Sequence, residues 1–562
     1  MNPMVERAEA GASGAGRGVL GQIARGILCA LVIATVSVRA VAASDSDVAE
    51  GIVALLARTD PIVLDGVAVN GPALRALYEG REGTLLWRDR VDAVTSILGD
   101  AAAEGLDAVA YSPAALTHRQ SDRTDEGKAA LDLLVSDAVL RYAHDVRYGR
   151  SRPRITAEAA IEPAPDVVPI VQAVAASANV DEALRDLPPR HPAYRSLRAV
   201  LATYRARLAT GERWPVLPDG PTLRPGESDA AVPILRTRLA ATGEFEGDAG
   251  ASSRRFDPAL VAAVKRFQET HGLVADGAVG PLVRAELNVG PATRVEQLVV
   301  NMERWRWLPE DLGARRVMVN IAAARIRLVD GEATEFEGPV IVGEPDKMTP
   351  QFSSSITHVV FNPTWTVPDK IARRELLPKV QRDGAYFERQ GIRLIGNWHP
   401  GSSTDNPEKV DWNGAHGASG FRLRQAPGPQ NPLGRVKFLL PNVFGVYLHD
   451  TSNRGLFRRE RRTLSHGCVR VGGALDLADE VLVDLPSWSE ARRDRILSSW
   501  NTTTITLDRP LAVHLMYETA SVDPDGRVHF FDDVYGRDRR LADALAGRKP
   551  EPVAEVLRTA EP

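Results

Sequence analysis

The chain has 562 residues, of which 44% are hydrophobic and 25% charged, and its formal net charge is −4. Because a single hydrophobic core stops growing near roughly 250–300 residues, this length predicts several domains. The composition is typical of ordinary soluble domains and excludes a disordered chain or a polytopic membrane protein. The balance of charges and the lack of a long Lys/Arg run argue against a nucleic-acid partner.

The N-terminus has the pattern of a secretory signal peptide over residues 1–43. Arg17 and Arg25 precede an apolar run, residues 27–38, and small residues follow it. The run is shorter than the roughly 20 residues that a spanning helix needs, so we expect export with cleavage after Ala42 or Ala43. Retention as an uncleaved membrane anchor is the alternative.

Export would leave one cysteine in the mature chain. Cys29 lies inside the apolar run, and Cys468 is the only other cysteine. A single thiol cannot form an internal disulfide in an oxidising compartment. Cys468 is therefore either a buried, inert residue or a reactive one.

Residues 45–215 are predicted to form a helical scaffold domain. Apolar residues recur at helical spacing in segments such as 130–142. No residue pattern in this domain indicates chemistry, so we assign it a structural role.

A small helical module is predicted over residues 222–289, after the proline-rich linker 215–225. One of its helices has Asp257 as the N-cap and Pro258 in the first turn. Another begins at Pro281, and the three helices together would make a compact unit.

From Arg315 onward, apolar residues alternate, which predicts a mostly β domain over residues 300–515. The strand candidates include 315–321, 326–328, 358–361, 436–440 and 443–449, and segment 474–482 has helical spacing. The last residues, 516–562, are expected to pack on the scaffold or on this β domain. The fold class is therefore multidomain α+β.

Candidate catalytic residues lie in the string Ser465-His466-Gly467-Cys468-Val469-Arg470, which follows Tyr447-Leu448-His449-Asp450. A cysteine attacks only as the thiolate, and a free thiol with a pKa of about 8.5 needs a base or a cation nearby. His449 can be that base if the fold brings it close. Strand alternation puts Tyr447 and His449 on the same face.

The residues around the cysteine suggest further roles. Gly467 allows the backbone to turn, so that its amide and that of Cys468 could face a developing oxyanion. Arg470 could favour the thiolate or bind a substrate carboxylate. A zinc site of Cys468, His449 and His466 is an alternative, but it lacks the cysteine-rich or carboxylate-containing ligand sets that zinc prefers.

The string, with a histidine 19 positions before the cysteine (468 − 449), resembles the active-site signature of the L,D-transpeptidases, the YkuD-type catalytic domain. The resemblance is to the large periplasmic members, and it extends over Glu303-Arg304-Trp305-Arg306-Trp307-Leu308, Thr349-Pro350-Gln351-Phe352, Phe361-Asn362-Pro363-Thr364-Trp365, Asn431-Pro432-Leu433-Gly434, Lys437-Phe438 and Val534-Tyr535-Gly536-Arg537-Asp538. The module resembles the three-helix peptidoglycan-binding domain through Val264-Lys265-Arg266-Phe267-Gln268, Gly272-Leu273, Asp276-Gly277, Gly280 and Leu287-Asn288. The motif residues also have structural explanations, so the module either binds glycan or peptide or serves as a spacer.

The resemblance implies a reaction on peptidoglycan tetrapeptide stems. Cys468 would attack the carbonyl of the third stem residue, a meso-diaminopimelate, expel D-alanine and form a thioester. The diaminopimelate amine of an acceptor stem would then complete a 3→3 cross-link. Water as acceptor would give a carboxypeptidase, an amine of an outer-membrane protein would give a protein–stem link, and a non-catalytic wall-binding protein is a third possibility.

The resemblance also implies roles for single residues. His449 would be the general base, oriented by the backbone carbonyl of Asp450, while His466 and Arg470 would shape the donor site. We expect acylation by carbapenems and no metal or other cofactor. The expected catalytic residues are Cys468, His449, Gly467, His466 and Asp450, and the expected substrate-binding residues are Arg470, Ser465, Tyr447 and Trp365.

A long insert, residues 368–430, interrupts the predicted catalytic domain. A loop of this length in a compact domain is usually functional or disordered. The resemblance implies a mobile cap over the active site. Two histidines of the insert, His399 and His416, are expected on the surface and not as ligands.

Overall fold

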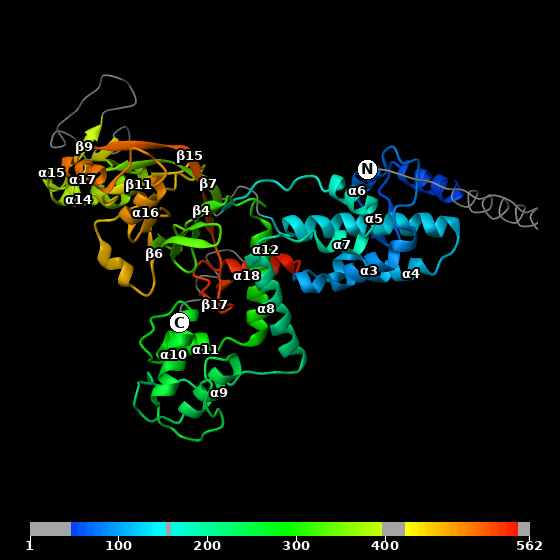
Figure 1. The fold of residues 1–562 in the computed structure, drawn as a ribbon, viewed down its shortest axis with the longest axis horizontal. Helices are drawn as coiled ribbons and strands as arrows, with labels where there is room; N and C mark the ends of the chain where they lie inside the picture. Colours follow the sequence, from blue (N-terminus) through cyan, green and yellow to red (C-terminus); the bar gives the residue numbers. More distant parts are fainter. Residues whose placement is uncertain (1–45, 153–158, 396–421, 549–562) are drawn as a thin grey trace, which may run out of the picture. The chain divides into compact units, whose positions relative to one another are not determined.

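The computed structural model describes residues 46–152, 159–395 and 422–548 (Figure 1). The predicted signal peptide, His399 and His416 lie outside these residues. Within the described residues, no helix has the length and apolar character needed to cross a membrane. The described residues divide into two compact units. The first comprises residues 46–100, Ala108–Ala143 and Asp166–Arg185, and the second comprises Ala101–Asp107, the described residues from 144 to 165, and those from 186 onward.

The first unit is mostly helical, as expected for the scaffold. Its elements are β1 Val63–Leu64, β2 Val67–Ala68, α2 Gly71–Tyr78, α3 Val91–Gly99, α4 Pro113–Gln120, α6 Val168–Ala176, α7 Val180–Arg185 and the greater part of α5 Asp125–Tyr148. Helix α5 contains the predicted segment 130–142. Its buried Asp132 accepts hydrogen bonds from the backbone amides of Leu86 and Trp87, both at 2.9 Å, so the chain before α3 is fastened to α5.

Helix α8, Pro192–Ala209, belongs to the second unit although its sequence lies in the predicted scaffold segment. It packs along α12, Pro291–Arg306. The buried side chains that α8 and α12 contribute to their shared core are Tyr194, Leu197, Leu201, Leu298, Met302 and Trp305. Helix α8 therefore groups with α12, which lies much further along the chain, and not with the helices that precede it.

The predicted three-helix module is present as α9 Val232–Thr242, α10 Pro258–Thr270 and α11 Pro281–Leu287. Asp257 caps α10, as predicted, by accepting a 2.9 Å hydrogen bond from the Leu260 amide. Buried Gln268 accepts from the Gly277 amide at 2.8 Å and donates to the Ala278 carbonyl at 3.0 Å. These motif residues thus hold the turn between α10 and α11.

The β domain is built on one large sheet. Its strands are β3 Ala159–Ala160, β4 Arg315–Asn320, β5 Arg325–Asp330, β6 Ala333–Gly343, β7 Gln351–Phe361, β11 Val436–Leu439, β12 Leu448–His449, β13 Thr463–Ser465, β14 Val469–Val471 and β15 Thr503–Met516. The order is β11-β12-β14-β6-β5-β4-β15-β7-β3, with β13 beside β6. Because β11 also pairs with β7, the sheet closes on itself around an apolar core. Helices α16, Ala474–Leu482, and α17, Glu490–Ser499, follow β14.

The predicted strand 443–449 is wrong over most of its length, because only Leu448 and His449 form a strand. The Asn442 side chain accepts hydrogen bonds from the backbone amides of Phe444 and Val446, at 3.0 and 3.1 Å. Gly445 has a left-handed φ of 66°. A side chain that captures backbone amides competes with strand pairing and makes a turn here.

Together with the residues just before it, the described part of the insert forms a small folded substructure. Its elements are β8 Trp365–Thr366, α13 Asp369–Ile371, η4 Ala372–Leu376, α14 Leu377–Arg382, α15 Tyr386–Arg389, β9 Ile392–Ile395 and β10 Arg422–Gln425, and the strand order is β8-β10-β9. They have their own core of Val367, Leu376, Val380, Phe387, Ile392, Leu394 and Leu423. These parts of the predicted cap are therefore neither a bare loop nor an extension of the main core.

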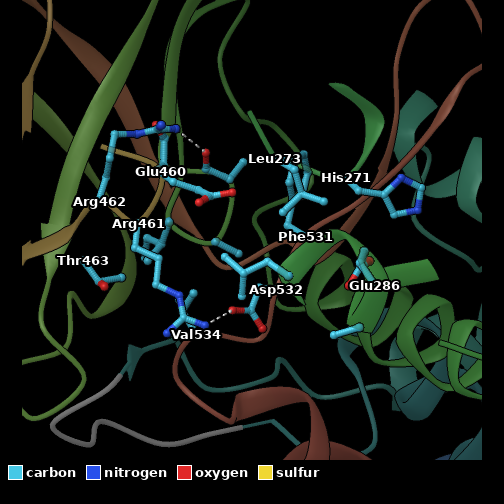
Figure 2. A pocket seen from close by; sticks show the side chains of 17 residues that line it. His271, Leu273, Glu286, Glu460, Arg461, Arg462, Thr463, Phe531, Asp532 and Val534 are labelled. Carbon is cyan, nitrogen blue, oxygen red and sulfur yellow. Dashed lines mark hydrogen bonds and ion pairs between the residues drawn. The ribbon is translucent and has the colours of Figure 1, made fainter. Parts of the chain in front are cut away.

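The C-terminal segment forms β16 Ala520–Val522, β17 Val528–Phe530 and α18 Arg537–Leu545. Between β17 and α18 it lines a cavity of about 240 Å³ together with the module and the β domain (Figure 2). The tail contributes Phe531 and Asp532, and Asp532 forms an ion pair with Arg461 at 3.6 Å. Neither Cys468 nor any other predicted site residue lines this cavity.

Candidate active site

One face of the closed sheet gathers three basic side chains. Lys437 on β11 is the register partner of His449 on β12, and His449 is in turn the partner of Arg470 on β14. Residues directly paired across strands point to the same side of a sheet. Their chain neighbours Phe438, Leu448 and Val469 lie in the apolar core on the other side.

Tyr447 and Cys468 lie just before β12 and β14, and the centre of the Tyr447 ring is 5.5 Å from that of the His449 ring. The Val469 amide donates a 3.2 Å hydrogen bond to the Tyr447 carbonyl, which places Cys468 beside Tyr447. The Tyr447 hydroxyl also hydrogen-bonds to the thiol. The structure therefore brings Cys468, His449, Tyr447 and Arg470 together, as the sequence predicts.

Burial raises the pKa of the Cys468 thiol above its ordinary value, so the resting thiol is protonated. The hydrogen bonds from Tyr447 and the charges of Lys437 and Arg470 act in the opposite direction. The Lys437 ammonium lies 3.7 Å from the centre of the Tyr447 ring. These groups stabilise the thiolate form once a base has accepted the proton of the thiol.

The His449 ring is held in one orientation by the backbone. Its Nδ1 lies 2.5 Å from the backbone carbonyl oxygen of Asp450. Since a carbonyl can only accept, Nδ1 carries the hydrogen and Nε2 has the free lone pair. Burial lowers the pKa of His449 to about 3, so the ring is neutral at neutral pH.

Asp450 contributes more than its carbonyl. Its carboxylate accepts a 2.9 Å hydrogen bond from the Arg435 amide and pairs with Arg454 at 3.4 Å. Gly434 lies so close that a Cβ there would meet the carboxylate at 2.4 Å. The contact that the resemblance implies between Asp450 and His449 is thus present, and its catalytic role stays a prediction.

The turn before the cysteine depends on Gly467 and Ser465. Gly467 has a φ of 108°, a conformation that L side chains rarely adopt. Its amide donates to Ser465 Oγ at 3.1 Å, and the Ser465 hydroxyl donates to the Cys468 carbonyl at 2.5 Å. The Gly467 amide is therefore already engaged, which leaves the Cys468 amide as the better candidate for an oxyanion donor.

His466 is exposed, and its Nε2 contacts Glu375 of the insert and Lys347 at 3.2 Å. It therefore links the turn at Ser465 to Cys468, called the catalytic turn below, to the insert. Trp365 lies on β8 and packs against the core of the insert. Their expected substrate contacts stay predictions.

Three residues of this region have no role assigned from the sequence, namely Lys437, Thr349 and Glu375, although Lys437 and Thr349 lie in strings that carry the resemblance. Lys437 is identified only by its register with His449. Thr349 is fully buried and donates a 2.9 Å hydrogen bond to the Gly467 carbonyl. In the part of the chain that the structure describes, no group of three or more His, Cys, Asp or Glu side chains is placed to hold a metal ion.

Comparison with known families assigns three domains. Residues 314–488 match the "L,D-transpeptidase catalytic domain" (YkuD), residues 72–201 match the "Scaffold domain", and residues 228–287 match the "Putative peptidoglycan binding domain". The three matched segments follow one another along the chain, in agreement with a multidomain protein. Over residues 314–488 the chain is thus similar to the catalytic domains of L,D-transpeptidases.

A Haemophilus influenzae protein named "Putative L,D-transpeptidase" is 34% identical over 246 residues, which is 44% of this chain and 49% of that protein. The matched region spans about half the length of this curated relative. Two solved L,D-transpeptidase structures are also similar. The one from Xylanimonas cellulosilytica has 16% identity over 53% of this chain and 98% of its own, with a TM-score of 0.18. The one from Stackebrandtia nassauensis has 14% identity over 54% and 96%, with a TM-score of 0.21.

Proposed function

We propose that this protein is a peptidoglycan L,D-transpeptidase that forms 3→3 cross-links through a thioester on Cys468. The observation that carries the proposal is the cluster in which Tyr447, Lys437 and Arg470 lie near both Cys468 and His449, with Nδ1 of His449 fixed by the Asp450 carbonyl. Such an arrangement leaves Nε2 as a general base for a thiol.

The reaction has two acyl-transfer steps. In the first, the Cys468 thiol gives its proton to His449 Nε2 while Sγ bonds to the carbonyl carbon of the third stem residue. The carbon–nitrogen bond to D-alanine then breaks, and the leaving amine takes the proton from His449. In the second step the diaminopimelate amine of an acceptor stem loses a proton to His449 and its nitrogen bonds to the carbonyl carbon. The carbon–sulfur bond then breaks, and His449 returns the proton to Sγ.

The surrounding groups support both steps. The Cys468 amide can donate to the oxyanion, and preorganised donors of this kind usually give the largest contribution in acyl transfer. Arg470 and Lys437 stabilise the negative charge that develops on sulfur. Arg470 is also suited to the carboxylate of a diaminopimelate.

Two other acceptors would use the same residues. Water would give an L,D-carboxypeptidase, and an amine of an outer-membrane protein would give a protein–stem link. The proposed location is the periplasm, reached through the N-terminal segment 1–43. The module would bring the catalytic domain to its polymer, which sedimentation of the protein with purified peptidoglycan sacculi can test.

The function is tested with purified mature protein and disaccharide-tetrapeptide muropeptides, analysed by mass spectrometry. We expect a dimer that has lost one D-alanine, and we expect Cys468→Ala to form none while melting at a temperature close to the wild type. Tripeptide without dimer would identify a carboxypeptidase. No conversion by a folded wild-type protein would contradict both stem-directed activities.

A further inference from the structure

The C-terminal residues Val534 to Asp538 lie far from Cys468 in sequence, yet they are connected to the catalytic turn by hydrogen bonds. The Tyr535 side chain is fully buried, and its hydroxyl donates to the Gly343 carbonyl at 2.7 Å. The same hydroxyl accepts from the Thr349 amide at 3.3 Å. Tyr535 thus clamps the turn between β6 and β7.

Thr349 connects the turn that Tyr535 holds to the backbone next to Cys468. Its hydroxyl accepts from the Gly343 amide at 2.9 Å and donates to the Gly467 carbonyl at 2.9 Å. Arg537 donates to the Thr349 carbonyl at 3.0 Å. The backbone and hydroxyl of Thr349 are therefore fixed from three sides.

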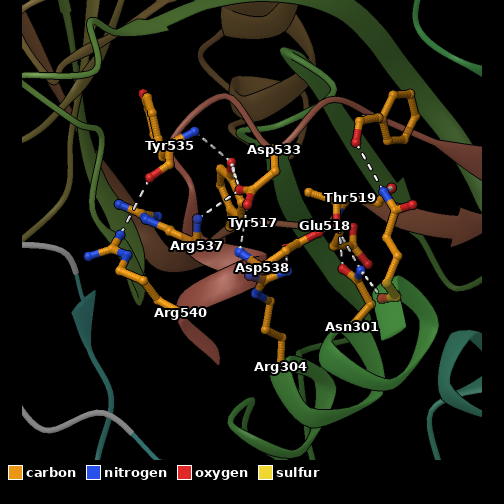
Figure 3. Close-up of polar contacts among 12 residues, drawn as sticks. Asn301, Arg304, Tyr517, Glu518, Thr519, Asp533, Tyr535, Arg537, Asp538 and Arg540 are labelled. Atoms are coloured by element: carbon orange, nitrogen blue, oxygen red, sulfur yellow. Dashed lines mark hydrogen bonds and ion pairs between the residues drawn. The ribbon is translucent and has the colours of Figure 1, made fainter. Parts of the chain in front are cut away.

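The clamp itself is rigidly supported (Figure 3). The Tyr517 hydroxyl accepts from the Tyr535 amide at 2.9 Å and donates to Asp533 at 2.7 Å. The Tyr517 and Tyr535 rings stack at 5.5 Å, and the Arg537 guanidinium lies 4.9 Å from the centre of each ring. Burial raises the pKa of Tyr535, so its hydroxyl keeps the proton that it donates.

We propose that Thr349, held by Tyr535, is a positioning residue that aims the Cys468 amide at the reacting carbonyl oxygen. A trans peptide unit is planar, and its carbonyl and its following N–H point in opposite directions. By holding the Gly467 carbonyl, the Thr349 hydroxyl fixes the direction of the Cys468 N–H. The Gly467 amide already donates to Ser465, so the Cys468 N–H is the donor whose direction decides how well the oxyanion is stabilised.

The inference rests on the proposed acyl transfer at Cys468, but its test does not need the natural stem. An activated ester such as p-nitrophenyl acetate acylates a cysteine through a tetrahedral oxyanion and releases p-nitrophenolate. Iodoacetamide alkylates the same sulfur by displacing iodide and forms no oxyanion. Comparing the two rates at Cys468, by intact-protein mass spectrometry, separates positioning of the amide from reactivity of the thiol.

We expect Thr349→Val to slow acylation by about tenfold or more and to leave alkylation unchanged, because complete removal of an oxyanion donor costs about 10²–10³ in rate. Thr349→Ser, which keeps the hydroxyl, should restore acylation. Tyr535→Phe should slow acylation to a smaller extent. Tyr194→Phe is the matched control, because its buried hydroxyl makes equivalent bonds to Glu104 and Arg306, both at 2.9 Å, away from the turn.

Two results would overturn the inference. One is wild-type acylation by Thr349→Val, and the other is an equal fall in acylation and alkylation, which would indicate general loosening of the site. Thermal melting of each variant shows that the fold is retained. A wild-type protein that reacts with the ester but converts no muropeptide would contradict the proposed function and not this inference.

Discussion

At the level of single residues, burial determines the protonation of Cys468 and His449. It raises the pKa of the Cys468 thiol and lowers that of His449, so both are neutral at rest. A neutral pair needs no buried charge in the absence of substrate, which avoids the cost of an isolated ion. The nearby Lys437 and Arg470 then help only when negative charge appears on sulfur.

The low pKa of His449 predicts that it makes stability depend on pH. In the unfolded chain a histidine has a pKa near 6.5, whereas folded His449 stays neutral down to about pH 3. The unfolded state therefore binds more protons between these values, and the stability contributed at pH 7.5 is lost as the pH falls through this window. For this residue the free energy of unfolding at pH 5 is about 2 kcal/mol lower than at pH 7.5.

The measurement is urea unfolding of the wild type and of His449→Asn at pH 7.5 and 5.0. Other buried histidines, such as His191 and His514, also have lowered pKa values, so only the difference between the two proteins reports on His449. We expect the wild type to lose more stability on acidification than the variant. Parallel changes in the two proteins would show that His449 is protonated to the same extent in both states.

At the level of elements, the insert has an apolar core of its own. Phe387 on α15 is fully buried and packs in the insert core with Val380 and Leu394. Removing a buried phenylalanine side chain costs about 3–5 kcal/mol, which is a large share of what so small a core can supply. We expect Phe387→Ala to unfold the insert locally.

Hydrogen exchange with mass spectrometry tests this expectation. Amides of β9 and α14 should exchange much faster in Phe387→Ala, whereas those of β15 in the closed sheet should keep their protection. The matched control is Phe361→Ala, whose fully buried side chain lies in the main core. It should destabilise the sheet, and equal deprotection of β15 by both variants would contradict a separate insert.

The sequence predicted correctly those features that depend only on residues close together in the chain. The Asp257 cap, the helix 474–482 and the alternation of Tyr447 and His449 all follow from neighbours in the chain. The strand 443–449 was predicted too long because alternation alone does not show that Asn442 captures the backbone amides. No role was assigned to Lys437, because its place beside His449 depends on the pairing of β11 with β12.

The same reason explains why the tail was not assigned a role from sequence. The segment Val534 to Asp538 matched the family pattern, but its hydrogen bonds reach Gly343 and Thr349, nearly two hundred residues earlier. Such pairings become visible only when the sheet has closed. The clamp on the catalytic turn is thus a property of the tertiary fold.

At the scale of the second unit, the tail also joins the β domain to helix α12. Asp538 of α18 pairs with Arg304 of α12 at 2.6 Å and accepts from the Thr519 hydroxyl at 2.6 Å (Figure 3). Both charges are largely buried, and burial raises the pKa of Asp538 although Arg304 opposes this shift. Asp538 therefore links α18 to α12, which is distant in sequence, and to the segment at Thr519.

A double-mutant cycle on this pair tests whether it fastens the tail. Asp538→Asn keeps an acceptor for Thr519 but leaves the Arg304 charge without its carboxylate, and removing one partner of a buried pair costs about 3–5 kcal/mol. Arg304→Met should cost a similar amount, because it leaves the Asp538 carboxylate buried. The double variant should lose clearly less than the sum of the two, since neither charge then remains.

Urea unfolding measures the stability of each variant, and ester acylation of Cys468 should fall in the single variants if a loosened tail also releases Tyr535. Additive losses would show that the two charges do not stabilise each other, and unchanged acylation in a destabilised single variant would show that the clamp holds without this pair.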